Sequence, residues 1–388
     1  MTLSSQVTSA TPGLIALRRD LHQHAEIEFQ ETRTAGIVAE RLSAAGLDVE
    51  EHIGTTGVAA VLQGDGDGPT LMIRADMDAL PIAEQTGLPV ASTPGAMHAC
   101  GHDGHTAIAV TAAELLAAQR AQLNGRVVFA FQPAEENNTG AQAMADDGFF
   151  ERYTADRSIA LHLGSGDPVG QVSINAGPVL AGKDTFRLTI TGRGGHGAMP
   201  DLAIDPVVVS AHVIAALQTL VSREIPPNTM GVLTIGEVHS GTAGNIIPDR
   251  AVMSGAVRWY DETTQATLID GLIRTARGVA GGMRAGAEYE WLSGTPPAVN
   301  DPDATAWMRT VAAAVAGGDN VVDMEPRTAS DDMSLFLREA PGCYFFLGAA
   351  PPDTGITRAH HSSTFDIDES ALPIGVELFV RAALDYLA

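Results

Sequence analysis

In the stretch Thr70-Leu71-Met72-Ile73-Arg74-Ala75-Asp76-Met77-Asp78, a short apolar run passes directly into two carboxylates. A run of this kind, bounded by turn residues, is typical of a buried strand. Three similar runs occupy residues 58–63, 126–131 and 158–163, and a helical pattern over residues 33–45 stops at Gly46. Strands and helices that alternate over about the first 180 residues predict βαβ units around a mostly parallel sheet, which is an α/β fold.

The pattern changes at residue 184. Strands at 186–191, 231–238, 251–259 and 287–291 are interrupted by helical patterns at 205–222 and 262–279. This βαββαβ order describes a small ferredoxin-like sandwich inserted into a larger domain. The alternation of helix and strand resumes near residue 297. We therefore expect a larger domain over residues 1–183 and 296–388 and an inserted domain over residues 184–295.

Composition excludes several classes of protein. A chain of 388 residues that is 45% hydrophobic is long enough for a large core. Its net charge of −24 argues against nucleic acid or an anionic membrane as a partner, because both require clustered Lys and Arg. Cys100 and Cys343 are too few for a disulfide framework. The polar N-terminus lacks a secretory pattern, and we expect that no apolar run reaches membrane-spanning length, so we expect a cytoplasmic protein.

The segment Met97-His98-Ala99-Cys100-Gly101-His102-Asp103-Gly104-His105 gathers metal-binding side chains. Carboxylates follow two of the predicted strands, in Asp76-Met77-Asp78 and in Glu135-Glu136, and His162 lies near the end of another. Ligands of open α/β sheets collect at the carboxyl ends of the strands, so these side chains are expected to converge. Thiolate, imidazole and carboxylate together suit a divalent transition metal, and a neighbouring carboxylate is free for proton transfer. The sequence therefore predicts a metallohydrolase.

Several motifs in one order carry a resemblance to a known family. They are RADMDALP (74–81), MHACGHDGHT (97–106), PAEE (133–136), LHL (161–163), GRGGHGAMP (192–200), NIIPD (245–249) and HHSSTF (360–365). From about Leu17 to the C-terminus the chain resembles the dinuclear metal-dependent aminoacylases and carboxypeptidases, in the branch that contains hippurate hydrolase and the indole-acetyl-amino-acid amidohydrolases. The resemblance implies that the larger domain is catalytic and that the inserted domain serves dimerisation or acts as a lid.

Residue by residue, the resemblance implies ligands for two divalent ions and a group that moves protons. The matching ligands are Cys100, His102, Glu136, His162 and His361. Glu135 matches the general acid/base, and Asp78 matches the acidic residue that orients a metal-binding side chain. His360 competes with His361 for one ligand position, and His361 is favoured because it stands directly before the small residues and the aromatic one. Zn fits Cys and His best, while Mn, Co and Ni also suit mixed donor sets.

Other polar residues of the motifs have less specific roles. Two interpretations are open for Asp76, His98 and His105: they hydrogen-bond the ligands, or they are only neighbours in the motif. His196 lies in a glycine-rich run, and the resemblance implies that it reaches into the partner subunit's active site and polarises the scissile carbonyl. A homodimer joined through the inserted domain follows from that role. Asn245 and Arg258 are candidates for holding the substrate, because a guanidinium suits a free carboxylate, although a structural ion pair is an equal alternative for Arg258.

The expected activity is metal-dependent hydrolysis of the amide bond of a small-molecule N-acyl amino acid. A dipeptidase or carboxypeptidase that acts on free peptides is the alternative, since both substrates present an amide next to a carboxylate. A metal-bound scaffold without activity would be expected to lack the base or a ligand, and none is missing. A thiol enzyme with Cys100 as nucleophile and His102 as its base is a further alternative.

The chain departs from the family pattern at four places that bear on substrate choice. Ala25 precedes Glu26 where Pro is usual, and Asn137-Asn138-Thr139 follows the glutamate pair where Gly is common. Asp331-Asp332-Met333 stands where Glu-Asp-Phe is frequent, and Ser363 replaces a usual Pro. None of these departures removes an expected ligand or the expected base. The loop after Glu136 and the segment around Asp331 are expected to border the substrate pocket.

Overall fold

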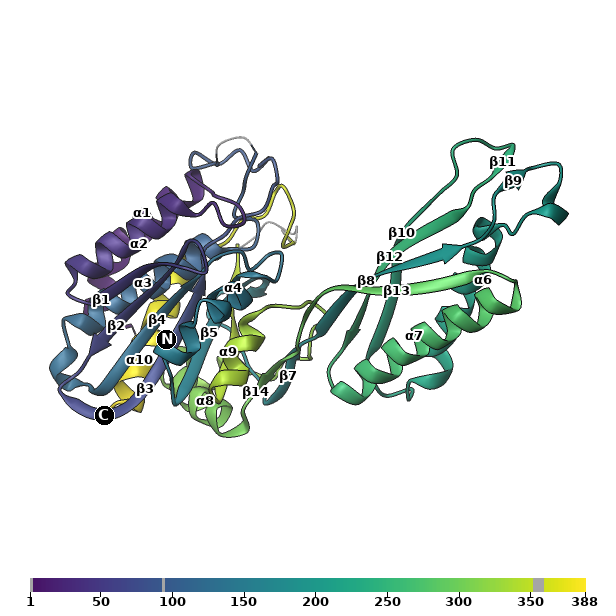
Figure 1. The fold of residues 1–388 in the computed structure, drawn as a ribbon. Helices are drawn as coiled ribbons and strands as arrows, with labels where there is room; N and C mark the ends of the chain where they lie inside the picture. Colours follow the sequence, from purple (N-terminus) through teal and green to yellow (C-terminus); the bar gives the residue numbers. More distant parts are fainter. Residues whose placement is uncertain (1–2, 93–94, 352–358) are drawn as a thin grey trace. The chain divides into compact units, whose positions relative to one another are not determined.

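The computed structural model describes residues 3–92, 95–351 and 359–388, and the chain forms two compact units (Figure 1). Unit 1 consists of Met1–Val179, Ala298–Glu325 and Asp331–Ala388, and unit 2 consists of Leu180–Pro297 and Pro326–Ser330. Each unit has an apolar core of its own. Each therefore buries its own sheet against its own helices, which is what a separate domain requires.

The core of unit 1 is an eight-stranded sheet in the order β1-β2-β4-β3-β5-β16-β6-β15. Its strands are β1 (Asp48–Ile53), β2 (Gly57–Gln63), β3 (Gly66–Asp76), β4 (Asn124–Gln132), β5 (Arg157–Pro168), β6 (Val172–Ser173), β15 (Val321–Val322) and β16 (Gly342–Ala350). The central strands β4, β3, β5 and β16 run parallel, and antiparallel pairs occur toward both edges. The prediction of a mostly parallel sheet is confirmed. A separate pair of short strands is formed by β7 (Gly177–Leu180) and β14 (Ala298–Asn300).

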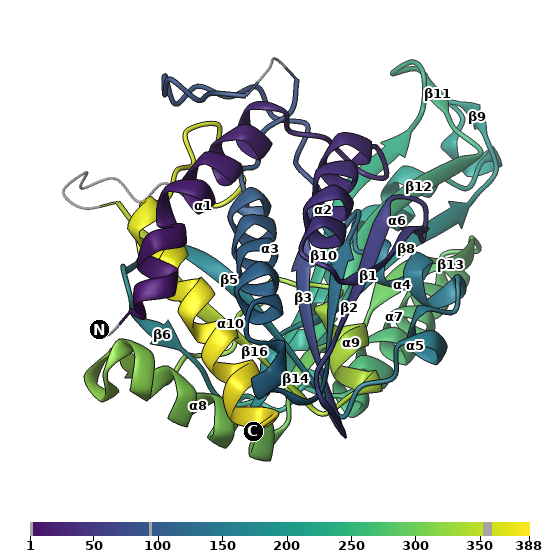
Figure 2. The ribbon, with the colours of Figure 1, turned by 90° about the vertical axis from the view of Figure 1, so that its left-hand side faces the viewer.

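Two groups of helices pack on this sheet. The first contains α1 (Ser5–Gln23), α2 (Thr32–Ala44), α3 (His102–Ala117), α8 (Pro302–Ala316) and α10 (Leu372–Tyr386). Figure 2 shows α1, α3 and α10 side by side, in agreement with their mutual contacts. Helix α3 is buried around most of its circumference, as expected for a helix with apolar or small residues on all sides. The second group contains α4 (Gly140–Asp146), α5 (Phe149–Arg152) and α9 (Met333–Glu339).

The order of the central strands creates the place where a site can form. The chain leaves β3 through α3 to enter β4 on one side, and it then passes through α4 and α5 to β5 on the other side of β3. Right-handed crossovers in opposite directions place their helices on opposite faces of a sheet. The strand order therefore reverses at the carboxyl end of β3, which is where open α/β sheets bind ligands.

The turn after β4 is exceptionally tight. A Cβ atom added to Gly140 would overlap the carbonyl oxygen of Pro133. The amide of Gly140 also donates to the carbonyl oxygen of Ala134. Only a residue without a side chain fits at this position, so Gly140 fixes the path of the loop that carries Glu135 and Glu136.

Unit 2 contains a four-stranded antiparallel sheet in the order β10-β12-β8-β13. Its elements are β8 (Gly182–Thr191), α6 (Pro206–Thr219), β10 (Gly231–Ser240), β12 (Arg250–Trp259), α7 (Glu262–Gly282) and β13 (Gly286–Thr295). Helices α6 and α7 lie together on one side of the sheet (Figure 1). The βαββαβ prediction is confirmed. Two short strands, β9 (Gly195–His196) and β11 (Ile246–Ile247), form an additional pair.

The expectation that no apolar stretch reaches membrane-spanning length is wrong for one helical segment. Within the helical segment Pro206–Glu224, a window of 18 residues has a mean hydropathy of 1.3, and 33% of that window is buried. The segment joins α6 to a turn of π-helix at Leu220–Glu224. Its apolar side contributes Val209, Val213, Leu217 and Leu220 to the core of unit 2, so this length of apolar helix covers a sheet.

Substitution of Gly140 tests the tight turn. We expect Gly140→Ala to lower the free energy of unfolding by about 3 kcal/mol, because the new methyl group forces the backbone of the turn to move. Gly36→Ala is the matched control, since nothing lies within 4 Å of its added Cβ inside α2. It should raise stability by about 0.5–1 kcal/mol. Urea unfolding midpoints measure both effects, and equal midpoints for the two variants would contradict this description of the turn.

Candidate metal centre and active site

Seven of the residues that the sequence singled out lie together in unit 1. Asp78 follows β3, the glutamate pair follows β4, His162 lies within β5, and the remaining three lie at the start of α3 or between β16 and α10. These seven are Asp78, Cys100, His102, Glu135, Glu136, His162 and His361. They gather at the carboxyl ends of the central strands, where the sequence analysis expected them to converge, and the strand order reverses there.

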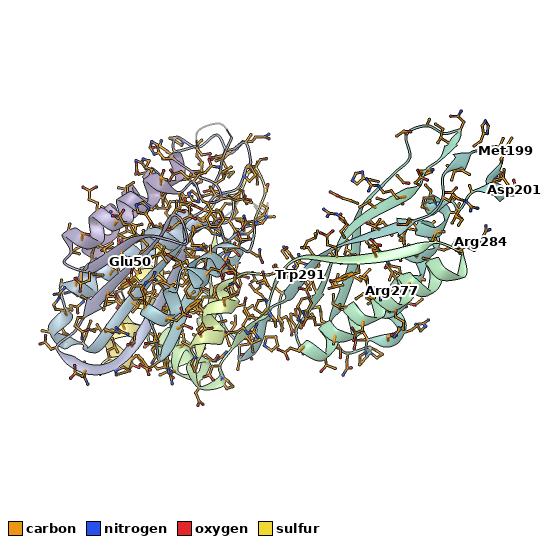
Figure 3. The ribbon with its side chains drawn as sticks, in the orientation of Figure 1. Glu50, Met199, Asp201, Arg277, Arg284 and Trp291 are labelled. Carbon is orange, nitrogen blue, oxygen red and sulfur yellow. The ribbon has the colours of Figure 1, made fainter. Side chains whose placement is uncertain are left out.

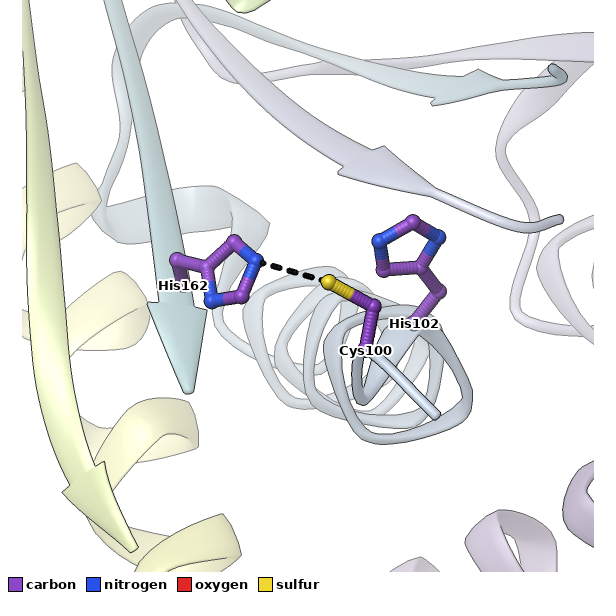
Figure 4. Close-up of side chains that lie close together, drawn as sticks. All are labelled: Cys100, His102 and His162. Carbon is purple, nitrogen blue, oxygen red and sulfur yellow. Dashed lines mark hydrogen bonds between the residues drawn. The ribbon is translucent and has the colours of Figure 1, made fainter. Parts of the chain in front are cut away.

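Cys100 is the centre of this cluster. Its Sγ atom lies 3.4 Å from Nε2 of His162, with His102 alongside (Figure 4). Gly101, with φ of 91°, adopts the left-handed conformation that favours glycine, and it turns the chain between Cys100 and the first residue of α3. Cys100 also belongs to a second donor group, with Glu136 and His361, in which the donor atoms lie within 4.8 Å of one another.

The donor atoms fit a divalent transition metal. Nε2 of His102 and Oε1 of Glu136 are buried without a hydrogen-bond partner among the residues that the structure describes. Buried polar atoms of this kind are costly unless something else satisfies them. A thiol, imidazoles and carboxylates converge on the same space, which is the donor set that such metals prefer.

Asp78 contacts two of the predicted ligands. Nδ1 of His102 lies 2.8 Å from the carbonyl oxygen of Asp78 and 3.3 Å from its Oδ1 atom. The other carboxylate oxygen accepts the amide N–H of Glu136 at 3.0 Å. These contacts leave Nε2 of His102 as the atom that faces the cluster. Asp78 therefore orients an imidazole and the glutamate loop together.

Asp76 and His105 lie beside His102, and the donor atoms of the three residues lie within 4.8 Å of one another. Nδ1 of His105 lies 2.6 Å from Oδ1 of Asp76, and Nε2 of His105 accepts the amide N–H of Leu163 at 2.9 Å. The pair connects β3, α3 and β5 next to His162. His98 differs from them, because both of its ring nitrogens are buried without a hydrogen-bond partner in the described part of the chain. Burial lowers the pKa of His98 to about 4.

Two histidines lie close to the cluster at the late motif. Nε2 of His361 lies 3.2 Å from Oε2 of Glu136, whereas Nδ1 of His360 lies 3.7 Å from Sγ of Cys100. The ring of His360 also contacts the ring of His162, with 5.1 Å between the centroids. Both histidines are therefore in reach of the cluster, and His361 contacts the carboxylate of Glu136.

Burial shifts the ionisation of the central groups. Burial and the neighbouring Asp331 and Glu136 carboxylates raise the pKa of Glu135 well above its usual value. Burial also raises the pKa of Cys100, and the charge of Glu136 adds to this effect. A thiol with a raised pKa is a poor nucleophile, which does not favour the thiol-enzyme alternative. A divalent cation would reverse both shifts by supplying positive charge.

A buried carboxylate group lies beside Glu135, in the segment that the sequence analysis expected to border the substrate pocket. Oxygen atoms of Glu135, Asp331 and Asp332 lie within 4.8 Å of one another. The guanidinium of Arg74 offsets part of this charge, with Nη2 3.1 Å from Asp331 and 3.3 Å from Asp332. Burial and the adjacent Asp331 raise the pKa of Asp332 to about 7. In the sequence, only the departure at Asp331-Asp332-Met333 drew attention to this segment.

Three further predicted residues lie in unit 2. His196 is exposed on β9. Its Nδ1 atom accepts the amide N–H of Ala198 at 3.1 Å, so Nε2 takes no part in this hydrogen bond. Asn245 is exposed, and its backbone carbonyl oxygen accepts the amide N–H of Gly197. Figure 3 labels Met199 and Asp201 at this same end of the unit.

Arg258 lies on β12 and is partly buried. Its Nη1 atom donates to the carbonyl oxygen of Thr328 at 2.8 Å. No carboxylate within ion-pair distance of Arg258 is present among the described residues, so the structural ion pair considered from the sequence is not formed by that part of the chain. Its guanidinium thus keeps donors that can bind a carboxylate from outside.

Comparison with known proteins identifies the family. A model of Peptidase family M20/M25/M40 matches residues 72–385. An N-acetylcysteine deacetylase from Bacillus subtilis (strain 168) is 38% identical over 373 residues, which cover 96% of each chain. Thermostable carboxypeptidase 1 from Saccharolobus solfataricus is 35% identical over 378 residues, or 96% of this chain and 95% of the relative.

A solved structure agrees with these sequence matches. The YXEP protein of Bacillus subtilis, a dinuclear metal binding peptidase from the M20 family, superposes with a TM-score of 0.84 at 33% identity. The superposition covers 98% of this chain and 99% of that protein. The resemblance on the motifs is confirmed, and this chain belongs to peptidase family M20/M25/M40 as a metal-dependent amidohydrolase.

Proposed function

We propose that this enzyme hydrolyses the amide bond of N-acyl amino acids, so that water and the amide yield an acyl acid and a free amino acid. The observation that carries the proposal is the buried donor cluster around Cys100 with Glu135 directly beside it. Similarity over nearly the whole chain to an N-acetylcysteine deacetylase supports an N-acylated amino acid as the substrate class.

Five side chains would hold two divalent ions, and Cys100 belongs to both donor groups. The proposed ligands are Cys100, His102, Glu136, His162 and His361, for Zn, Mn, Co or Ni. When bound, such ions lower the pKa of a water molecule and polarise the carbonyl of the substrate. In this arrangement, Glu135 accepts a proton from the attacking water and delivers it to the nitrogen of the leaving amine. Asp78 keeps the ring of His102 in its binding orientation.

Substrate binding is assigned to residues of unit 2. The guanidinium of Arg258 is proposed to bind the free carboxylate of the amino acid, because its described partner is only a backbone carbonyl. Asn245 is proposed to contact the substrate from the exposed loop beside His196. His196 is proposed to donate from Nε2 to the oxygen of the scissile carbonyl as negative charge develops there.

A homodimer is proposed as the working form, with His196 of each protomer completing the site of its partner. Large apolar side chains are exposed around the β9 and β11 pair of unit 2, which favours a protein contact there. They include Met199, Leu202, Val207, Val208 and Ile246. The proposed location is the cytoplasm, where Cys100 stays reduced and able to bind metal.

Removal and return of metal tests the activity and separates it from a peptidase. The chelator-treated enzyme should lose turnover and regain it with one or more of Zn, Mn, Co and Ni. N-acyl amino acids should be hydrolysed faster than dipeptides and peptides with a free C-terminus. The carboxypeptidase alternative, which the similarity to a thermostable carboxypeptidase favours, predicts the reverse ranking.

Substitution of Glu135 and substitution of Glu136 are predicted to impair different properties of the enzyme. Glu135→Gln should lower kcat by about 10²–10⁴-fold and leave the metal content unchanged, because an amide cannot accept the proton. Glu136→Gln is the matched comparison and should lose bound metal, since it removes a ligand. Turnover assays with metal analysis by mass spectrometry distinguish the two variants. Near-normal turnover of metal-loaded Glu135→Gln would refute the proposed mechanism.

Mixing of two inactive variants tests whether His196 acts across a dimer. Glu135→Gln and His196→Ala should each be inactive alone. When they are unfolded and refolded together, each mixed dimer should contain one site with an intact Glu135 and an intact His196 from its partner. About a quarter of wild-type activity is expected, because half of the dimers are mixed and each has one working site. No recovery of activity in confirmed mixed dimers would place His196 outside the partner's site.

A further inference from the structure

Ala134, directly before Glu135, has an unusual backbone conformation. Its φ angle is 47°, in the left-handed region that residues with a side chain rarely adopt. Ala134 is completely buried, and its carbonyl oxygen accepts the amide N–H of Gly140. The direction in which the Glu135 side chain leaves the backbone depends on this turn. Something in the surrounding structure must therefore stabilise it.

A buried carboxylate from a distant part of the chain makes that contact. Glu31, which immediately precedes α2, is fully buried, and its Oε1 atom accepts the amide N–H of Ala134 at 3.0 Å. The same oxygen accepts the amide N–H of Phe29 at 3.0 Å, and Oε2 accepts the hydroxyl of Thr56 at 2.5 Å. Three donors thus satisfy a carboxylate that has no ion-pair partner in the described part of the chain.

The contact belongs to a pattern along the glutamate loop. Three backbone amides of the loop each donate to a buried carboxylate from a different element. Ala134 donates to Glu31, Glu136 donates to Asp78 at 3.0 Å, and Ala141 donates to Asp332 at 2.9 Å. Asp78 also contacts a proposed metal ligand, and Asp332 lies beside Glu135. Among the described contacts, Glu31 hydrogen-bonds neither a proposed metal ligand nor the side chain of Glu135.

We propose that Glu31 is a positioning residue for Glu135, acting through the peptide of Ala134. Its carboxylate holds the left-handed turn in place and so fixes the direction of the Glu135 carboxylate toward the reacting atoms. This inference rests on the proposed function of Glu135 as the base. Misplacement of a catalytic group by about 1 Å can cost about 10²-fold in rate, so a lost hydrogen bond at this turn should be visible in kcat.

Variants of Glu31 test the inference by separating kcat from KM. Glu31→Ala should lower kcat by about 10- to 100-fold, with KM changed less than about twofold and metal content unchanged. Glu31→Gln should retain most of kcat, because its amide oxygen can still accept from Ala134 and its NH₂ group can donate to the hydroxyl of Thr56. Equal losses of kcat in the two variants would overturn the inference.

Glu377 provides a matched control. It is also buried, and it accepts from the backbone amide and the hydroxyl of Ser4, but it lies on α10 and contacts none of the loop residues named above. Glu377→Ala should therefore reduce stability and leave kcat close to wild type. If Glu31→Ala and Glu377→Ala lower kcat equally, the effect of Glu31 is general destabilisation and the inference is wrong.

A measurement without turnover tests the same contact. Hydrogen exchange of the metal-free protein, read by mass spectrometry on a peptide covering residues 132–141, should be about tenfold faster in Glu31→Ala and unchanged in Glu377→Ala. Unchanged exchange in Glu31→Ala would overturn the inference. Loss of turnover in Glu135→Gln with full turnover in Glu31→Ala would refute only the positioning role, whereas an active Glu135→Gln would refute the proposed function itself.

Discussion

The arrangement of the site depends on the ion pairs and hydrogen bonds that the guanidinium of Arg74 forms. This guanidinium is fully buried at the end of β3, and it contacts Asp76 at 2.7 Å, Gln132 of β4 at 2.8 Å, and the two aspartates that precede α9. Removal of one partner from a buried ion pair typically costs about 3–5 kcal/mol, because a charge is left uncompensated. Asp76 in turn contacts His105 of α3. One side chain therefore links the elements that carry the proposed ligands and base.

Buried carboxylates serve two different purposes in unit 1. Some accept backbone amides, as Glu31 and Asp332 do for the loop of Glu135. Others, such as Glu136, keep a buried oxygen that has no hydrogen-bond partner among the residues that the structure describes. The same residue type thus provides rigidity in one place and affinity for a cation in another, according to the donors that surround it.

Much of the fold and of the donor cluster could be predicted from local patterns. The runs at residues 126–131 and 158–163 lie within β4 and β5, and the βαββαβ order describes unit 2. The N-terminal helix α1 was not anticipated, because its sequence is polar and contains Pro12; one side of it is buried through Leu14, Leu17 and Leu21. Strand β1 was also missed, since its residues DVEEHI show no apolar run. In both cases packing against neighbouring elements outweighs local propensity.

The sequence by itself determined the kinds of elements and the chemistry of the donors, because periodicity and side-chain type are properties of neighbouring residues. The position of Cys100 between two donor groups, the contact of Glu31 with Ala134 and the closeness of Asp331 and Asp332 to Glu135 were decided only by the tertiary structure. These contacts join residues far apart in the chain, and their geometry depends on strand order and helix packing. No local pattern encodes which buried donor will meet which acceptor, since that choice is made when the sheet and its helices pack.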